Sequence, residues 1–191
     1  MLKKEEMLQT INIWKSMPRN NVDEMALADR YFDEVLMPIS LDMFMEKEGN
    51  NPKCHYDGMV LTLGTSWQPL ALSISVLKPK KILIMGTEDT EKYFVQLKKF
   101  LGRECEIITW KKVDRANVED IYAVCTKWLK ENLEITKVGA DITGGTKAMV
   151  AGLAMYAAKA KWDIFYVESK YLPLYRRPEP GSEMLIKLQL P

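Results

Sequence analysis

The first 50 residues carry apolar side chains at helical spacing. One stripe ends before Pro18, and a second runs from Ala28 to Ile39. Asp23 is a candidate N-cap for the second helix, and Pro38 is expected to kink it, because proline lacks the amide hydrogen that a helix interior needs. Two interpretations stay open: these helices cover the rest of the protein or a dimer partner, or they form an arm that docks another protein.

From residue 57 onward, short apolar runs alternate with amphipathic helical segments. The spacing predicts strands at residues 59–63, 81–85, 104–109, 138–142 and 163–167, with helices between them and a last strand at 184–190. Successive strand-helix units wind into a mainly parallel sheet with right-handed crossovers. The predicted fold class is therefore α/β, a Rossmann-like doubly wound sheet whose alternating last strand forms an antiparallel edge. We expect a helical extension at 1–50 and a ligand-binding domain at 57–191.

The turn after the fourth strand carries the strongest chemical signal. The sequence VGADITGGTKAM (138–149) passes from a buried strand through paired glycines into a helix. Glycine lets a ligand approach the backbone, and the first amides of a helix have no intrahelical partner, so such a turn suits phosphate. Thr143 and Thr146 add hydroxyls. An ordinary turn with a threonine cap is the alternative, but it leaves Lys147 unexplained at a helix start, where the dipole disfavours a cation.

A second loop, residues 64–68, follows the first strand. In doubly wound sheets, ligands bind outside the carboxyl ends of the strands, where the winding reverses. If the first and fourth strands are the central neighbours, the two loops face each other across that crevice. The candidate ligand-binding residues are Gly64, Thr65, Ser66, Gln68, Thr87, Thr143, Gly144, Gly145, Thr146 and Lys147.

Two common nucleotide-binding motifs do not fit these loops. Gly139 and Gly144 have the separation of a Walker loop, but two residues stand between the second glycine and Lys147. The first loop has the single glycine Gly64 in place of the glycine triplet of a dinucleotide-binding turn. The sequence therefore disfavours both motifs.

The composition is that of an ordinary globular protein, with 191 residues of which 47% are hydrophobic and 28% charged. A net charge of +1 provides no large field to recruit DNA or membranes, so a charged ligand must be met by a local site. The three cysteines show neither CxxC nor Cys/His metal spacing, which predicts packing roles in a reducing cytoplasm. Because no transmembrane run or signal peptide is evident, we expect a cytoplasmic protein. We also expect it to contain no metal or cofactor.

Three motifs resemble those of the CARF domain, the CRISPR-associated Rossmann-like fold. They are DITGGTKAM (141–149), LGTS followed by Gln-Pro (63–69), and YRRPEPGSEMLIKL (175–188). The resemblance covers roughly residues 57–191. It implies a homodimer that binds a cyclic oligoadenylate, with cyclic tetra-adenylate as the expected ring, across its two-fold axis in type III CRISPR antiviral signalling. It places the ligand in the two loops, where Asp141 is expected to order the turn rather than touch the ligand.

The resemblance leaves an enzyme and a binding module as alternatives. As a metal-independent ring nuclease, the protein would let a ribose 2′-OH attack its own phosphate, with Lys147 stabilising charge and Ser66 or Thr65 orienting the ribose. No general base is evident, since the only histidine, His55, precedes the first strand. As a sensor, the protein would leave the ring intact and signal through residues 1–50 to a separate effector. Family members usually carry an effector domain after the CARF portion, and this sequence ends at Pro191, which disfavours cleavage of another substrate.

Weaker candidates lie outside these loops. Trp67 could stack on an adenine or pack in the core. The third strand ends in Trp110, Lys111 and Lys112 on the ligand side, and the last loop contains Tyr171, Tyr175, Arg176 and Arg177, which could close over the ring or brace the dimer. The small residues of the helix after the fourth strand allow close packing on the sheet or against a second copy: Ala148, Ala151, Gly152, Ala154 and Ala158.

Overall fold

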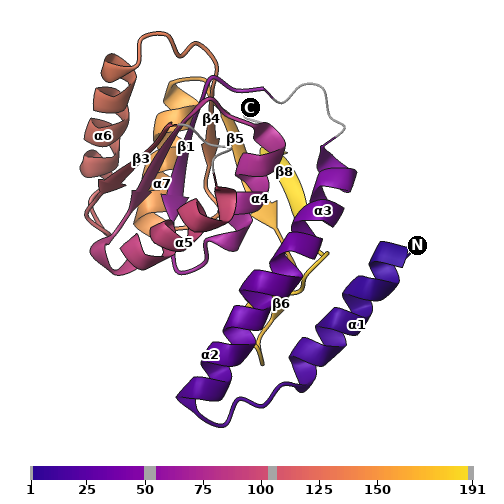
Figure 1. Cartoon of the computed structure of the whole chain (residues 1–191). Coiled ribbons are helices and arrows are strands. Elements are labelled where there is room, and N and C mark those ends of the chain that lie inside the picture. The colour runs from indigo at the N-terminus through magenta and orange to yellow at the C-terminus, as the bar shows by residue number, and fades with distance from the viewer. Residues whose placement is uncertain (1, 50–54, 103–106, 189–191) are drawn as a thin grey trace. The chain divides into compact units, whose positions relative to one another are not determined.

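The structure is a computed structural model that describes residues 2–49, 55–102 and 107–188. Its elements, in chain order, are α1 (Leu2–Ser16), α2 (Val22–Tyr31), the π-helical turn η1 (Phe32–Leu36), α3 (Met37–Glu48), β1 (Gly58–Leu63), α4 (Gln68–Leu77), β2 (Lys81–Gly86), the 3-10 turn η2 (Glu88–Thr90), α5 (Glu91–Leu101), β3 (Ile107–Lys112), α6 (Val118–Glu131), β4 (Val138–Asp141), α7 (Lys147–Lys159), β5 (Asp163–Glu168), β6 (Tyr171–Leu172), β7 (Arg177–Pro178) and β8 (Met184–Leu188) (Figure 1). They fall into two compact units. We call them the sheet unit (55–102, 107–167 and 185–188) and the helical unit (2–49 and 168–184).

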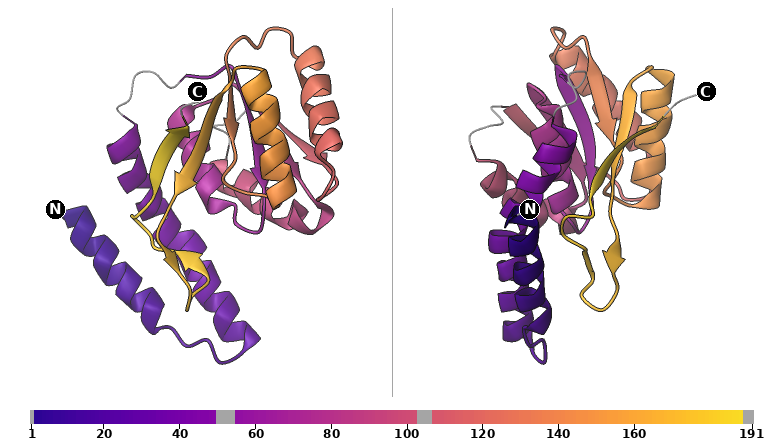
Figure 2. Two further views of the ribbon diagram at one scale, coloured as in Figure 1. Left: turned by 180° about the vertical axis from the view of Figure 1, so that it is seen from behind. Right: turned by 90° about the vertical axis from the view of Figure 1, so that its right-hand side faces the viewer.

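Six strands form one sheet in the order β3-β2-β1-β4-β5-β8. The pairs β3-β2, β2-β1, β1-β4 and β4-β5 are all parallel. Lys187, near the end of β8, lies 2.7 Å (Nζ to Oδ1) from Asp163 at the start of β5, as an antiparallel edge strand requires. Helices α4 and α5 cover one face of the sheet, and α6 and α7 cover the other (Figures 1 and 2). The predicted α/β class, Rossmann-like winding and antiparallel edge are confirmed.

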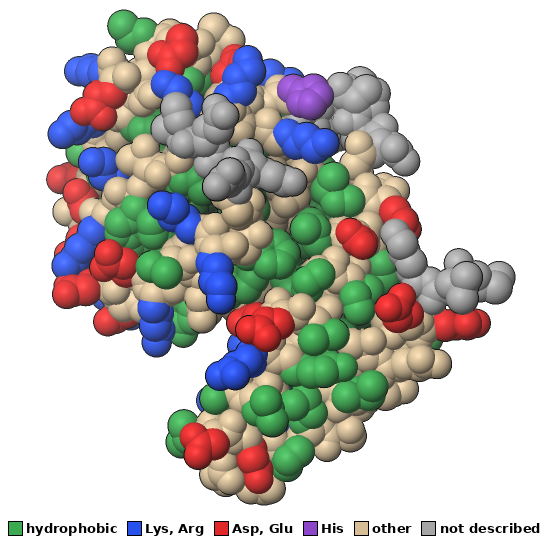
Figure 3. Space-filling view, in the orientation of Figure 1, with side chains coloured by type: hydrophobic (Ala, Val, Ile, Leu, Met, Phe, Trp, Pro, Cys, Tyr) green, Lys and Arg blue, Asp and Glu red, His purple; other side chains and the backbone are tan. Residues whose placement is uncertain are grey.

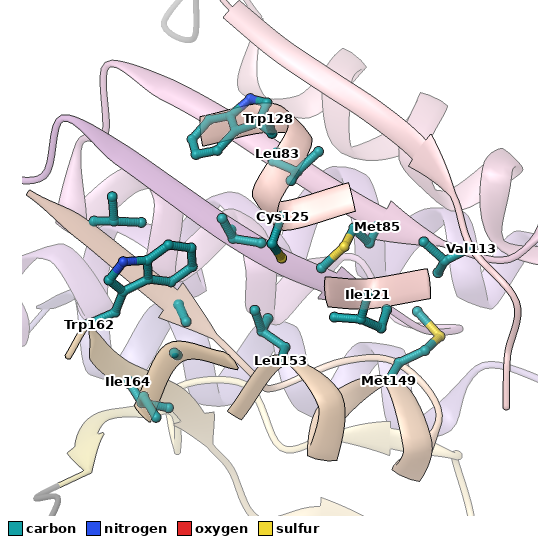
Figure 4. Close-up of a cluster of buried hydrophobic side chains, with 14 residues drawn as sticks. Leu83, Met85, Val113, Ile121, Cys125, Trp128, Met149, Leu153, Trp162 and Ile164 are labelled. Carbon is teal, nitrogen blue, oxygen red and sulfur yellow. The ribbon is translucent and has the colours of Figure 1, made fainter. Parts of the chain in front are cut away.

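A core cluster lies between the sheet and the layer of α6 and α7 (Figure 4). Ile121 and Cys125 of α6 and Leu153 of α7 meet apolar side chains of the strands there. Burial raises the pKa of the Cys125 thiol to about 12, which keeps it protonated and agrees with the predicted packing role. The other two cysteines, Cys54 and Cys105, lie outside the described residues.

The helical unit has a core of its own around Trp14. The Trp14 ring is 1% exposed and lies 5.1 Å from the ring of Phe32 and 4.8 Å from that of Tyr175, between ring centroids. Tyr175 belongs to the 168–184 segment, which contains the hairpin β6-β7. This segment therefore packs with the N-terminal helices, although the predicted boundaries place it in the ligand-binding domain. The assignment of 57–191 as one functional domain stays a prediction.

Two details of these helices differ from the sequence expectations. The N-cap of α2 is Asn21, whose side chain accepts a hydrogen bond from the Glu24 amide (2.9 Å), and the expected cap Asp23 lies in the first turn. The expected kink takes the form of the π-helical turn η1, which immediately precedes α3 and Pro38. Pro38 cannot bond to the Glu34 carbonyl one turn earlier and its ring would crowd that oxygen, so the wider turn accommodates it.

Every helix within the described ranges is too short or too polar to cross a membrane.

Candidate functional site

The candidate site lies where the winding of the sheet reverses. β1 and β4 are central neighbours, with β2 and β3 on one side and β5 on the other. Their parallel register pairs Leu61 with Asp141, so the loops that follow both strands leave the same edge of the sheet. Residues 64–67 and 142–146 therefore meet, as the sequence predicts.

The two loops approach each other through their backbones. A Cβ atom added at Gly64 would lie 2.8 Å from the nitrogen of Gly145, and one at Gly144 would lie 2.7 Å from the carbonyl oxygen of Thr62. Gly145 also has a φ of +103°, which side chains rarely tolerate. The close approach depends on glycine at these positions.

A cavity of about 190 Å³ opens between the loops and is lined by Gly64, Thr65, Ser66, Pro69, Thr143, Gly144 and Gly145. Six of these are predicted ligand-binding residues. The seventh, Pro69, was not predicted as a site residue, although a proline in the first turn of α4 is a recognisable helix-start signal. Backbone groups and hydroxyls supply the polarity of the cavity, because none of its lining residues has a titratable side chain.

Four predicted ligand-binding residues lie outside this lining: Gln68, Thr87, Thr146 and Lys147. Gln68 begins α4 and is only 2% exposed. Thr87 precedes the turn η2 and follows the neighbouring strand β2. The Thr146 hydroxyl already has two protein partners, since it accepts from the Met149 amide (3.3 Å) and donates to the Arg115 carbonyl (2.6 Å). Thr146 is thus the N-cap of α7, which was the structural alternative considered for this turn.

Lys147 is the first residue of α7 and is exposed, next to the cavity lining in sequence but not part of it. Within the described ranges, its ammonium group forms no ion pair. The amides of the first helical turn have no intrahelical partner, and Thr146 caps only that of Met149. This end of α7 therefore combines a mobile cation with the positive end of the helix dipole.

Asp141 lies fully buried beneath the turn. Its Oδ1 accepts a hydrogen bond from the Thr143 amide (2.8 Å), and its Oδ2 has no hydrogen-bond partner among the described residues. Burial raises the pKa of Asp141, and the nearby Ser73 hydroxyl and the Thr143 groups offset that rise only in part. The Thr143 hydroxyl in turn accepts from the Val167 amide (2.8 Å). Asp141 therefore contacts the turn and not the cavity.

Several weaker candidates have structural partners. Trp67 is 3% exposed and packs on Phe100 with ring centroids 5.0 Å apart, which matches core packing rather than adenine stacking. Trp110 stacks on Phe94 at 4.9 Å, and Lys112 pairs with the Glu88 carboxylate. These contacts occupy the Trp110 ring and the Lys112 ammonium group at the end of β3.

Two candidates of the 168–184 segment, Tyr175 and Arg177, contact the N-terminal helices. The Arg177 guanidinium lies 2.9 Å from Asp29 and 3.7 Å from Asp33, nitrogen to oxygen, and 5.1 Å from the ring centroid of Phe32. Tyr175 packs on the Trp14 ring. Tyr175 and Arg177 thus hold the segment on the N-terminal helices.

Among the described residues, those that line the cavity include no metal ligand or general base. His55 is exposed and precedes β1, at the opposite edge of the sheet from the loops. Among the residues that the structure describes, no cluster of His, Cys, Asp or Glu could hold a metal ion. The cavity therefore presents backbone groups and hydroxyls, and the exposed Lys147 follows its lining residues in the sequence.

Comparison with known proteins adds an independent observation. No family model matches the chain. The CRISPR system endoribonuclease Csm6 of Thermus thermophilus is 29% identical over 161 residues, which are 81% of this chain and 34% of Csm6. The chain thus spans about a third of the length of this curated relative.

Solved structures share the fold. Can2 from Sulfobacillus thermosulfidooxidans in complex with cyclic tetra-adenylate superposes with a TM-score of 0.53 at 17% identity, over 68% of this chain and 33% of Can2. Enterococcus italicus Csm6 bound to cyclic hexa-2′-fluoro-hexa-dAMP superposes with a TM-score of 0.52 at 12% identity, over 71% of this chain and 43% of that Csm6. At these identities, the likenesses show that the chain shares the fold of these proteins.

Thr62, like Pro69, is a residue of the candidate site that was not predicted from the sequence. Thr62 lies within β1, is fully buried, and donates its hydroxyl hydrogen to the Gly144 carbonyl. In an apolar strand, a threonine is ordinarily interpreted as a packing residue. The available signal was that Thr62 is the one polar side chain in the run MVLTL (59–63).

Proposed function

We propose that the protein is a cytoplasmic receptor for cyclic oligoadenylate and that two copies bind one ring. The observation that carries the proposal is the cavity between β1 and β4, where the hydroxyl-bearing residues Thr65, Ser66 and Thr143 lie beside the amino end of α7. Amides, hydroxyls and a positive helix end suit the phosphates and ribose hydroxyls of a nucleotide. Two structures with the same fold, Can2 and the Enterococcus italicus Csm6, contain cyclic adenylate ligands.

The size of the cavity favours a site shared by two copies. Its volume of about 190 Å³ is below the roughly 300 to 1,000 Å³ of pockets that enclose a drug-sized ligand. A ring of several adenylates is larger than such a ligand. A two-fold dimer presents every loop twice, which matches the symmetry of an even-numbered ring.

Helix α7 offers a face for the second copy. Gly152 is buried, and a Cβ there would lie 3.3 Å from an α6 side chain, whereas Ala151, Met155 and Ala158 are exposed. Met155 is exposed over 58% of its surface. These three residues recur every three or four positions from Lys147, so they share its face of the helix. The small residues of α7 therefore serve inner packing at Gly152 and are free for dimer packing along the Lys147 face.

The fate of the ring separates two versions of this function. In the enzymatic version, a ribose 2′-OH attacks its own phosphate and leaves linear products with 2′,3′-cyclic phosphate ends. Lys147 would stabilise the phosphorane, a role in which one donor contributes roughly 3 kcal/mol, and Ser66 would orient the ribose. No lining residue can take the 2′-OH proton. The geometry therefore supports binding without turnover best.

In the binding version, a ligand-induced shift could reach the helical unit through a hydrogen bond and the chain itself. Thr143 lines the cavity and accepts the Val167 amide, and Glu168 begins the segment that packs with the N-terminal helices. A ligand that shifts Thr143 would therefore act directly on the start of this segment. Hydrophobic side chains are visible over the helices in Figure 3, and α1 and α2 expose large ones on which an effector protein could dock: Leu8, Ile13, Val22, Met25 and Leu27.

The deciding experiment mixes the protein with cyclic tetra-adenylate or cyclic hexa-adenylate in EDTA. Calorimetry measures binding, light scattering measures the dimer, and chromatography follows ring opening. Wild type is compared with Lys147→Ala and with Lys159→Ala, a matched exposed lysine in the last turn of the same helix. We expect one ring per two chains, about tenfold weaker binding for Lys147→Ala, and wild-type binding for Lys159→Ala.

Each outcome has a distinct meaning. Metal-independent opening that is lost in Lys147→Ala would establish the ring nuclease version. Binding with an intact ring would establish a sensor. Failure of the wild type to bind either ring would overturn the proposed function.

A further inference from the structure

The hydroxyl of Thr62 is hidden beneath the ligand turn. Thr62 is fully buried and its neighbours Leu61 and Leu63 are apolar, as the interior of a covered sheet requires. Its Oγ1 donates a hydrogen bond to the carbonyl oxygen of Gly144. The hydroxyl thus cannot meet a ligand itself, but it holds a backbone group of the cavity lining.

This bond fixes the orientation of one peptide unit. Every peptide bond that the structure describes is trans. In a trans peptide, the carbonyl and the following N–H point in opposite directions. When Thr62 holds the Gly144 oxygen beneath the turn, the Gly145 N–H points away from Thr62.

The space beside the Gly145 nitrogen is left open by Gly64. A Cβ atom at position 64 would lie only 2.8 Å from that nitrogen, so any side chain there would cover it. Both glycines line the cavity. An anion in the cavity can therefore reach this amide, provided that the peptide does not flip.

Backbone amides on either side of the Gly144-Gly145 peptide already have hydrogen-bond partners. Asp141 accepts the Thr143 amide from below, and the Thr146 hydroxyl caps the first turn of α7. The Gly144-Gly145 peptide lies between these two anchors and consists of glycine, the residue with the widest choice of conformations. Thr62 supplies the contact that selects one of them.

We propose that Thr62 is a positioning residue: its hydroxyl turns the Gly144-Gly145 peptide so that the cavity presents an N–H, and not a carbonyl oxygen, to an anionic ligand. A carbonyl in that place would put partial negative charge against a phosphate. The inference rests on the proposed function to the extent that the anion is a phosphate of the cyclic oligoadenylate.

The test uses Thr62→Val, which keeps the shape of the side chain and removes the hydroxyl, and Thr62→Ser, which restores it. Thr62→Ala removes the same hydroxyl and takes the place of the valine variant if that variant does not fold. The matched control is Thr10→Val in α1, because the buried Thr10 hydroxyl also donates to a backbone carbonyl, that of Glu6 (2.7 Å).

Two readouts are needed, one without ligand. The Gly145 amide signal and its hydrogen exchange are followed by NMR in the free protein, and affinity for both rings is measured by calorimetry. We expect Thr62→Val to move the Gly145 signal and to bind the ring about tenfold more weakly. This is the change in affinity that the loss of one hydrogen bond produces. Thr62→Ser should restore both, and Thr10→Val should change neither.

A Gly145 signal that stays in place in Thr62→Val would overturn the inference, as would wild-type affinity in that variant or a serine variant that restores neither readout. If the wild type binds neither ring, the proposed function fails, while the Gly145 signal of the free protein still decides how this peptide is oriented.

Discussion

Different kinds of contact stabilise the interior of the sheet unit and the interior of the helical unit. In the sheet unit, β1 is buried over its whole length and pairs through its backbone with β2 on one side and β4 on the other. In the helical unit, long side chains make the connections. The Trp14 indole donates to the Ala28 carbonyl (3.1 Å), and Arg177 joins the 168–184 segment to Asp29 and Asp33 of the helices.

The candidate site follows the pattern of the unit that contains it. Its two loops approach closely because glycines place no side chain between their backbones. The geometry of the site therefore requires that these positions carry no Cβ atom. The helical unit depends on particular aromatic and charged groups. Substitutions should therefore damage the site by adding atoms and the helical unit by removing them, and the following predictions test that contrast from the largest expected effect to the smallest.

Removing the Trp14 side chain should have the largest effect. Trp14→Ala empties the centre of the helical core and should destabilise that unit by about 3–5 kcal/mol, whereas Leu8→Ala on the exposed side of the same helix should cost less than about 0.5 kcal/mol. Hydrogen exchange read separately for each unit measures both. Equal loss of protection in the sheet unit would show that the two units unfold as one.

Adding a methyl group at Gly144 should have the next largest effect. The new Cβ would lie 2.7 Å from the Thr62 carbonyl oxygen, a backbone atom that cannot move aside cheaply, so Gly144→Ala should cost about 1–3 kcal/mol and abolish ring binding. Thermal melting and calorimetry measure the two effects. Gly181→Ala, whose nearest neighbour is the flexible end of Met43 at 3.4 Å, should bind the ring like the wild type. Normal binding by Gly144→Ala would contradict the assignment of the site.

The two units share one feature, a buried carboxyl with an unpartnered oxygen. Burial raises the pKa of Asp141 and of Glu183, whose other oxygen accepts from the Ser40 hydroxyl (3.0 Å). The folded state therefore keeps these protons at pH values where the unfolded chain has lost them. The stability contribution of each group is present at acid pH and is lost as pH rises from the unfolded pKa through the raised folded pKa.

Asp141→Asn and Glu183→Gln keep the shape of each group and cannot ionise. As pH rises above about 4, the free energy of unfolding of each variant should increase relative to that of the wild type. The difference should reach about 1–3 kcal/mol once the wild-type carboxyl is charged. Melting temperatures at matched pH values give the difference. A gap between wild type and variant that stays constant with pH would show that these carboxyls do not titrate on unfolding.

Removing the Arg177 charge should have the smallest effect. Arg177→Met keeps much of the side chain over the Phe32 ring and loses the ion pairs with Asp29 and Asp33. The free energy of unfolding should fall by about 0.5–1 kcal/mol at low salt. Because salt screens exposed charges, the difference from wild type should shrink in 1 M NaCl, where the Debye length is about 3 Å. Urea denaturation at both salt concentrations measures it. Lys127→Met, which loses only the exposed pair with Glu131, should lie nearer zero.

Local sequence patterns predicted the sheet and the place of the site but not the helical unit as a whole. Strands buried on both faces appear as continuous apolar runs, and the winding then brings residues 64–67 and 142–146 together. The hairpin β6-β7 has strands of only two residues, too short for any periodicity to show. Arg177 was assigned no structural partner, because charged residues in a loop do not indicate which distant carboxylates they will meet.

The sequence by itself determined the α/β winding, the N-terminal helices and the two glycine loops, because each follows from periodicity or from residues whose conformational range is set by their own chemistry. Only the tertiary structure decided which groups face the cavity. It buried Gln68, committed the Thr146 hydroxyl to capping, and placed Thr62 under the turn. Such assignments depend on contacts between residues distant in sequence, as with Thr62 and Gly144, and no local pattern records these contacts.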